Sequence, residues 1–178
     1  MTEWAMSDIS ENAKKIWHLT APGVLIACLF ILNIIPHAIP EYGTIKPDLI
    51  LIVIFYWSVH RPTIMPPSIS FLLGLLMDVF SAFPLGLNAF IFVLVQKFIS
   101  DQRKLFLGQP YYVSWIGFAF ICVVANALKT TVFTFVNSNL PSTGEIALHV
   151  GLTVAIFPLI TILLIGAHKL MLKAERRS

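Results

Sequence analysis

Five polar or ionisable side chains lie inside otherwise apolar stretches of this sequence: Asp78, Asn88, Asn126, Lys129 and His149. A carboxylate, an ammonium and an imidazole can bind a polar ligand or pass a proton, and amides can hold that ligand in place. The alternative is structural, because polar side chains of membrane helices often hydrogen-bond a neighbouring helix. In the structural case Asp78 either pairs with Lys129 or caps the helix end that precedes "SAFPLG".

Other kinds of chemistry have little support in the residues. No G-x-S-x-G, H-E-x-x-H or P-loop pattern occurs, and no spacing of His, Cys, Asp and Glu predicts a metal site. Cys28 and Cys122 lie inside apolar runs without C-x-x-C spacing, which predicts two small buried side chains. We therefore expect no enzyme, no cofactor and no metal.

The elements that must position these side chains are long and apolar. Apolar residues make up 57% of the chain and charged residues 12%, against roughly 25% charged in an ordinary soluble domain. A helix needs about 20 apolar residues to cross a bilayer. We predict an all-α integral membrane protein, with residues 1–178 as one membrane domain. Six transmembrane helices are expected, at residues 16–35, 45–61, 67–82, 84–100, 110–136 and 146–172.

The positions of Lys and Arg predict how the chain is oriented. Cytoplasmic loops of membrane proteins carry an excess of both residues. With both termini in the cytoplasm, ten of the 12 fall on the cytoplasmic side, Lys46 falls outside and Lys129 lies within a helix. The ten are Lys14, Lys15, Arg61, Lys97, Arg103, Lys104, Lys169, Lys173, Arg176 and Arg177. The same bias explains the net charge of +3 without nucleic-acid binding.

The second predicted helix, residues 45–61, is short for a membrane crossing. Seventeen residues extend about 25 Å, slightly less than the hydrocarbon thickness of about 30 Å. Asp48 in its first turn would complement the positive end of the helix dipole, and Arg61 could reach the cytoplasmic headgroups. We therefore expect this segment to span the bilayer with help at both ends.

Two stretches resemble the bacterial rod shape-determining MreD family: "PDLILIVIFYWSVHRP" and "LLGLLMDVFSAFPLGLNAF". Their order and spacing carry the resemblance, which is best over residues 47–97. The matching positions are Pro47, Asp48, Tyr56, Trp57, Arg61, Pro62, Gly74, Asp78, Pro84, Leu85 and Gly86.

The resemblance implies a non-enzymatic component of the cell-elongation machinery in the bacterial inner membrane. Its expected partners are MreC, MreB (directly or indirectly), the glycosyltransferase RodA and a penicillin-binding transpeptidase. The family is also similar in fold to the substrate-binding S components of energy-coupling-factor vitamin transporters. A vitamin-binding S component is therefore the alternative function. In that case the five polar residues, which we expect to converge in the outer half of the membrane, would be a retained pocket. Gly23 and Ala27 form a small-xxx-small pair that could pack closely against another helix.

Overall fold

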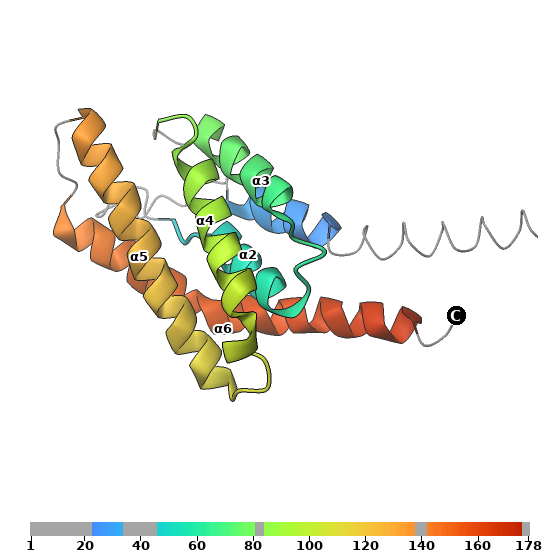
Figure 1. Cartoon of the computed structure of the whole chain (residues 1–178). Coiled ribbons are helices and arrows are strands. Elements are labelled where there is room, and N and C mark those ends of the chain that lie inside the picture. The colour runs from blue at the N-terminus through green and yellow to red at the C-terminus, as the bar shows by residue number, and fades with distance from the viewer. Residues whose placement is uncertain (1–22, 34–45, 81–83, 138–141, 176–178) are drawn as a thin grey trace, which may run out of the picture.

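The computed structural model describes residues 23–33, 46–80, 84–137 and 142–175 (Figure 1). Within these ranges every regular element is helical, which confirms the predicted all-α class. The α-helices are Gly23–Asn33, α2 (Leu49–His60), α3 (Pro67–Phe80), α4 (Leu87–Gln102), α5 (Tyr111–Asn137) and α6 (Thr143–Glu175), and a 3₁₀ turn, η1, covers Arg103–Leu105. Each predicted segment overlaps one of these α-helices, while the number of membrane crossings stays a prediction.

In the described part of the chain, two helices are long and apolar enough to cross a membrane. They are Tyr111–Val136 and Thr143–Lys169, with mean hydropathies of 1.8 and 2.5 over their best stretches. Only 33% and 22% of those stretches are buried inside the described part of the chain. Most of their apolar surface therefore faces outward, which a helix in lipid can accommodate and a core helix in water cannot.

The central helix is α2, which is buried along its whole length except at His60. A helix that is apolar on all sides is covered either by lipid or by other protein segments, and α2 is covered by protein. Phe55 shows how α2 is covered, because its ring makes edge contacts with Phe106, Phe118 and Phe157 at centroid distances of 5.5, 5.4 and 5.7 Å. The rings of Phe118 on α5 and Phe157 on α6 stack on each other at 4.4 Å.

The bounds of α2 differ from those predicted for the second segment. The helix starts at Leu49 and ends at His60, so its 12 residues rise only about 18 Å. Residues 46–48 are not helical, because Asp48 takes the N-cap position with its side chain accepting from the backbone N–H of Leu51. The helix ends before Pro62, since a residue that precedes proline disfavours helical backbone angles.

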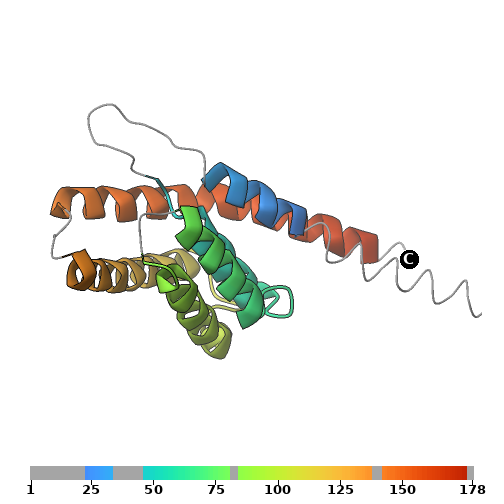
Figure 2. The ribbon, with the colours of Figure 1, turned by 90° about the horizontal axis from the view of Figure 1, so that it is seen from above.

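The remaining helices surround α2 in two groups. Helices α3 and α4 lie side by side as a hairpin, and α5 and α6 cross each other along another side of α2 (Figures 1 and 2). The indole N–H of Trp115 on α5 donates to the carbonyl of Val154 on α6 at 3.0 Å. α6 runs continuously through Pro158. The helix Gly23–Asn33 contacts α3, where the rings of Phe30 and Phe80 make an edge contact at a centroid distance of 6.3 Å.

Candidate functional site

A buried ion pair joins the start of α2 to the middle of α5. The ammonium Nζ of Lys129 lies 2.7 Å from Oδ2 of Asp48, and the two side chains are 9% and 4% exposed. Lys129 also lies 5.1 Å from the centroid of the Phe92 ring on α4, a cation–π geometry. In a low-dielectric interior each charge requires the other, because an isolated buried charge is strongly unfavourable.

Asp48 is held from several directions at once. Its Oδ1 accepts from the N–H of Leu51 at 3.2 Å, and its own backbone N–H donates to Oγ1 of Thr153 on α6 at 3.1 Å. The Thr153 hydroxyl in turn donates to the carbonyl of His149 at 2.7 Å. His149 lies close enough to Asp48 for an electrostatic interaction and hydrogen-bonds the backbone of Lys46.

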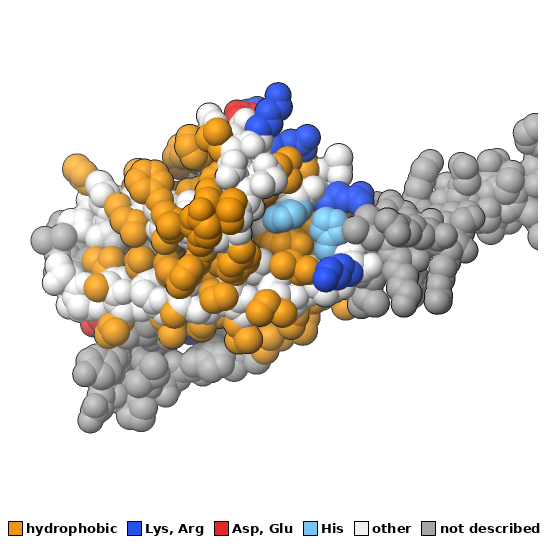
Figure 3. All heavy atoms as spheres, turned by 90° about the horizontal axis from the view of Figure 1, so that it is seen from below, with side chains coloured by type: hydrophobic (Ala, Val, Ile, Leu, Met, Phe, Trp, Pro, Cys, Tyr) orange, Lys and Arg blue, Asp and Glu red, His pale blue; other side chains and the backbone are white. Residues whose placement is uncertain are grey.

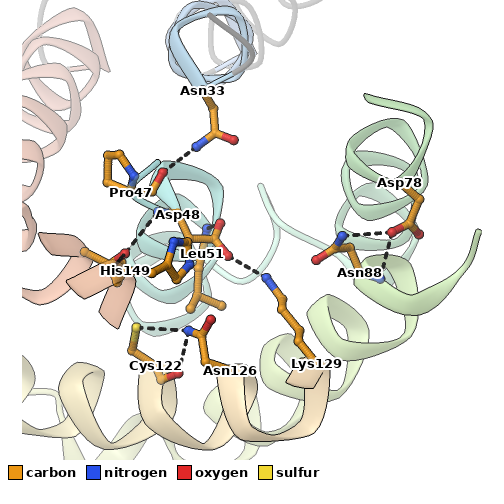
Figure 4. Close-up of polar contacts among 11 residues, drawn as sticks. Asn33, Pro47, Asp48, Leu51, Asp78, Asn88, Cys122, Asn126, Lys129 and His149 are labelled. Carbon is orange, nitrogen blue, oxygen red and sulfur yellow. Dashed lines mark hydrogen bonds and ion pairs between the residues drawn. The ribbon is translucent and has the colours of Figure 1, made fainter. Parts of the chain in front are cut away.

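The helix Gly23–Asn33 joins this region too, since the amide of Asn33 donates to the carbonyl of Pro47 at 2.8 Å (Figure 4). We name the group of polar residues that meet at the start of α2 the Asp48 cluster. Its members are Asn33, Asp48, Lys129, His149 and Thr153.

Asp78 forms a second, separate polar site at the start of α4. Its two carboxylate oxygens accept from the backbone N–H groups of Gly86, Asn88 and Ala89 at 2.8, 3.0 and 3.4 Å. The side-chain amide of Asn88 adds a fourth bond at 2.8 Å. A glycine N-cap has no side chain with which to satisfy the first N–H groups of its helix. Asp78 of α3 therefore supplies the cap for α4.

Gly74 explains how Asp78 comes so close to the backbone of α4. A Cβ at Gly74 would lie 2.4 Å from Cα of Ala89 and 2.7 Å from the carbonyl carbon of Asn88. Only a residue without a side chain permits this approach of α3 to α4. Gly86 contributes a backbone φ of +94°, a left-handed conformation that favours glycine. The second sequence motif thus describes one helical hairpin.

The five polar residues expected to converge are divided between these sites. Lys129 and His149 lie in the Asp48 cluster, whereas Asp78 and Asn88 bond each other at α4 (Figure 4). The alternative in which Asp78 pairs with Lys129 is wrong, because Lys129 pairs with Asp48. The alternative in which Asp78 caps a helix end is partly right. Asp78 caps the start of the following helix, α4, and not the end of its own helix, α3.

Asn126 contributes to neither site. Its amide donates to the carbonyl of Cys122 one turn earlier at 2.9 Å and lies 3.6 Å from the sulfur of that residue. Asp48, Thr153 and Asn33 were not expected in a cluster with Lys129. One signal for Asp48 was present in the sequence, since the topology places it at the outer start of its helix and Lys129 in the outer half of another.

A third site, at the opposite end of α2, is built from aromatic rings. Tyr56 Oη lies 3.4 Å from Nδ1 of His168 on α6, and the rings of Trp57 and His168 stack at 5.9 Å. His60 stacks on Tyr56 at 4.3 Å, and its Nδ1 lies 3.0 Å from the Tyr56 carbonyl. We name Tyr56, Trp57, His60 and His168 the ring cluster. Tyr56 and Trp57, two of the residues that match the family motif, thus link α2 to α6 through their contacts with His168.

The expectations for small residues have mixed outcomes. Gly23 and Ala27 are exposed, and nothing in the described part of the chain lies within 4 Å of a Cβ built at Gly23. Cys122 is buried as expected, but Cys28 is exposed. Cys28 follows Ala27 on a helix that rests on the bundle along one side only.

The chemistry available to these sites is hydrogen bonding and charge pairing between helices. Both buried carboxylates are engaged by donors from other elements. Among the described residues, no group of three or more His, Cys, Asp and Glu side chains could hold a metal ion. Fold and sites together define an all-helical protein with outward-facing apolar helices whose buried charges join helix to helix.

Comparisons with known proteins show to which family the chain belongs. The model of the rod shape-determining protein MreD family matches residues 14–171. The chain therefore belongs to the MreD family, which confirms the resemblance seen in its two motifs. It is also 28% identical over 131 residues to an uncharacterized protein of Rickettsia prowazekii (strain Madrid E), covering 73% of this chain and 74% of the relative. No solved structure matches it.

Membership in the MreD family assigns the protein a role in determining rod shape and identifies it as a membrane protein.

Proposed function

We propose that this protein is a non-enzymatic scaffold of the cell-elongation complex in the inner membrane of a rod-shaped bacterium. It joins MreC, and through it or directly MreB, to the glycosyltransferase RodA and a penicillin-binding transpeptidase. The observation that carries the proposal is the family match over residues 14–171. Six membrane crossings with both termini in the cytoplasm would let one chain contact partners on both sides.

The polar sites support a scaffold rather than a vitamin-binding S component. Asp48 and Lys129 neutralise each other at 2.7 Å, and Asp78 accepts four hydrogen bonds from the N-cap residue and the first turn of α4. A binding site for a polar ligand would need some of these groups to exchange a protein partner for the ligand, at the cost of leaving a buried group unpaired. Their present use is to hold helices together.

Leu85 is the part of the family motif that remains available to a partner. Pro84 and Gly86 build the turn into α4, with the N–H of Leu87 donating to the carbonyl of Pro84 at 3.2 Å. Leu85 between them is 74% exposed. The turn lies on the side that the topology predicts to be periplasmic, so we assign Leu85 to the contact with the periplasmic region of MreC.

Depletion of the protein in its own rod-shaped host tests the scaffold proposal. Cells should round up and lose wall-precursor incorporation along the cylinder, and the intact gene should restore both. Cells that stay rod-shaped but stop growing when one vitamin is scarce would instead support the S component.

Co-purification with MreC tests the assignment of Leu85. Leu85→Ser should reduce the MreC recovered while leaving the protein level unchanged. Phe135→Ser is the matched control, since Phe135 is 85% exposed on α5 and outside the motif. Equal recovery of MreC with both variants would remove Leu85 from the contact.

A further inference from the structure

The hairpin of α3 and α4 is short for a pair of membrane helices. α3 has 14 residues and α4 has 16, so they rise about 21 and 24 Å. The hydrocarbon core of a bilayer is about 30 Å thick, and a helix needs about 20 residues to cross it. A tilted helix needs more. Both helices are therefore shorter than an ordinary bilayer is thick.

Two hydrogen bonds hold the ends of the hairpin at matching levels. At one end Asp78 of α3 accepts from the backbone N–H of Gly86 at 2.8 Å. At the other end the side-chain amide of Gln96 on α4 donates to the carbonyl of Met65, just before α3, at 3.0 Å. The helical chain from Gly86 to Gln96 rises only about 15 Å. The polar groups at the two ends of the hairpin are thus separated by about half the thickness of a hydrocarbon core.

An exposed ion pair begins at the level of Gln96. Lys97 and Asp101 lie 3.2 Å apart, with side chains 68% and 58% exposed. Phe90 and Leu94 precede them on the same helical face and are 63% and 44% exposed. This face changes from apolar to charged about 15 Å from the start of α4, and even Asp101 is only about 21 Å along the helix. In a bilayer of ordinary thickness the pair would lie within the hydrocarbon, where charges are unfavourable.

The apolar surface of α5 is much taller. Its apolar stretch, Tyr111–Val136, has 26 residues and rises about 39 Å, enough to cross the bilayer even when tilted. Phe120 and Phe135 on it are 66% and 85% exposed. The hairpin is visibly shorter than α5 (Figure 1), and Figure 3 shows charged side chains at the edges of a broad apolar surface. The bundle thus presents apolar surfaces of unequal height on different sides.

We propose that the bilayer is thinned beside the α3–α4 hairpin, so that lipid headgroups reach the level of Lys97 and Asp101. Local thinning is one way in which a bilayer accommodates a short apolar surface. Lipid suits this side better than a charged partner protein, because Lys97 and Asp101 already neutralise each other and the exposed residues before them are apolar.

The proposal goes beyond the scaffold function. It requires α3 and α4 to cross the membrane, as the predicted topology has them, and it needs no partner protein. A failure of the MreC assay would leave it unaffected.

The thermal stability of the purified full chain in bilayers of different thickness tests the proposal. The melting temperature should be highest in dimyristoleoyl phosphatidylcholine, lower in the dioleoyl lipid and lowest in the dierucoyl lipid, whose chains are the longest. Replacing Lys97 and Asp101 together by leucine extends the apolar face of α4, so the optimum should move to the dioleoyl lipid. Thr131→Leu is the control, because Thr131 is exposed within the long apolar stretch of α5. Its optimum should stay with the dimyristoleoyl lipid.

The reactivity of single cysteines locates the membrane surface directly. Lys97→Cys, in a chain whose exposed Cys28 is replaced by serine, should react with a membrane-impermeant maleimide in dioleoyl nanodiscs. Leu94→Cys, about one turn earlier on the same face, should not react.

Three results would overturn the proposal. They are a melting temperature that is highest in the dierucoyl lipid, an optimum that the double leucine variant leaves unchanged, and a Lys97→Cys thiol that does not react. The last result would place the ion pair inside the hydrocarbon and indicate that a protein partner covers this face of α4 in the cell.

Discussion

Lys129 of α5 and Asp48 of α2 form an ion pair across 81 residues of sequence, with Nζ and Oδ2 2.7 Å apart and both side chains nearly inaccessible. Asp48 is at the same time the N-cap of the central helix. One carboxylate therefore both starts α2 and fixes where α5 lies against it. This coupling ties the start of the central helix to the position of α5.

Breaking the Asp48–Lys129 pair from one side should be more harmful than neutralising both members. Lys129→Met leaves a buried carboxylate unpaired and should lower the free energy of unfolding by ~3–5 kcal/mol. Asp48→Asn combined with Lys129→Met removes both charges while keeping an oxygen at the N-cap, and should recover part of that loss. Thermal unfolding in detergent measures both. A double variant less stable than Lys129→Met would contradict the pairing.

Removing the carboxylate of Asp78 should weaken the hairpin of α3 and α4. Asp78→Ala leaves backbone N–H groups of α4 unpaired, at ~1–3 kcal/mol for each one buried. We expect less protein in the membrane and less MreC recovered with it, measured by immunoblot before and after co-purification. Asp101→Ala is the control, because Asp101 is exposed and pairs only with Lys97 among the contacts described. Unchanged level and unchanged recovery with Asp78→Ala would exclude a structural role for this carboxylate.

Two helical glycines should respond to alanine in opposite directions. Gly74→Ala places a Cβ within 2.4 Å of the backbone of α4, so α3 and α4 must separate and the bonds to Asp78 must lengthen. At Gly151 nothing in the described residues lies within 4 Å of a Cβ. Gly151→Ala should therefore be neutral or stabilising by up to ~1 kcal/mol. Comparable melting temperatures for the two variants would show that the close approach at Gly74 is dispensable.

Thr153 should contribute through its hydroxyl and not through its shape. Thr153→Val keeps the volume but leaves the backbone N–H of Asp48 without its acceptor, at a cost of ~1–3 kcal/mol. Thr131→Val is the comparison, since Thr131 is exposed and donates only to the carbonyl of Ala127 in its own helix. A loss of thermal stability confined to Thr153→Val supports the link from α6 to α2. Equal effects would mean that the hydroxyl at Thr153 does not matter.

The sequence by itself determined the class of protein and much of its local structure. Long apolar runs must be helical where backbone groups have no water to bond, so helices appear where those runs occur. The sequence placed Asp48 in the first turn of a helix that ends before Pro62, and the structure moves the helix start to Leu49, with Asp48 as its N-cap. The order and spacing of the two motifs, at residues 47–62 and 72–90, were together distinctive enough to show the resemblance to the family, which the family match confirms.

Only the tertiary structure decided which polar groups meet. Lys129 could pair with either of two buried carboxylates, Asp48 or Asp78. The positions of these residues in the sequence do not say which helices are neighbours. The choice follows from Gly74, whose missing side chain lets α4 approach until its N–H groups fill the acceptors of Asp78. Asp48, buried at the start of the central helix, is then the carboxylate that Lys129 neutralises. Hydrophobic patterns determine which segments form helices, whereas backbone approach and charge pairing between distant segments determine how those helices fit together.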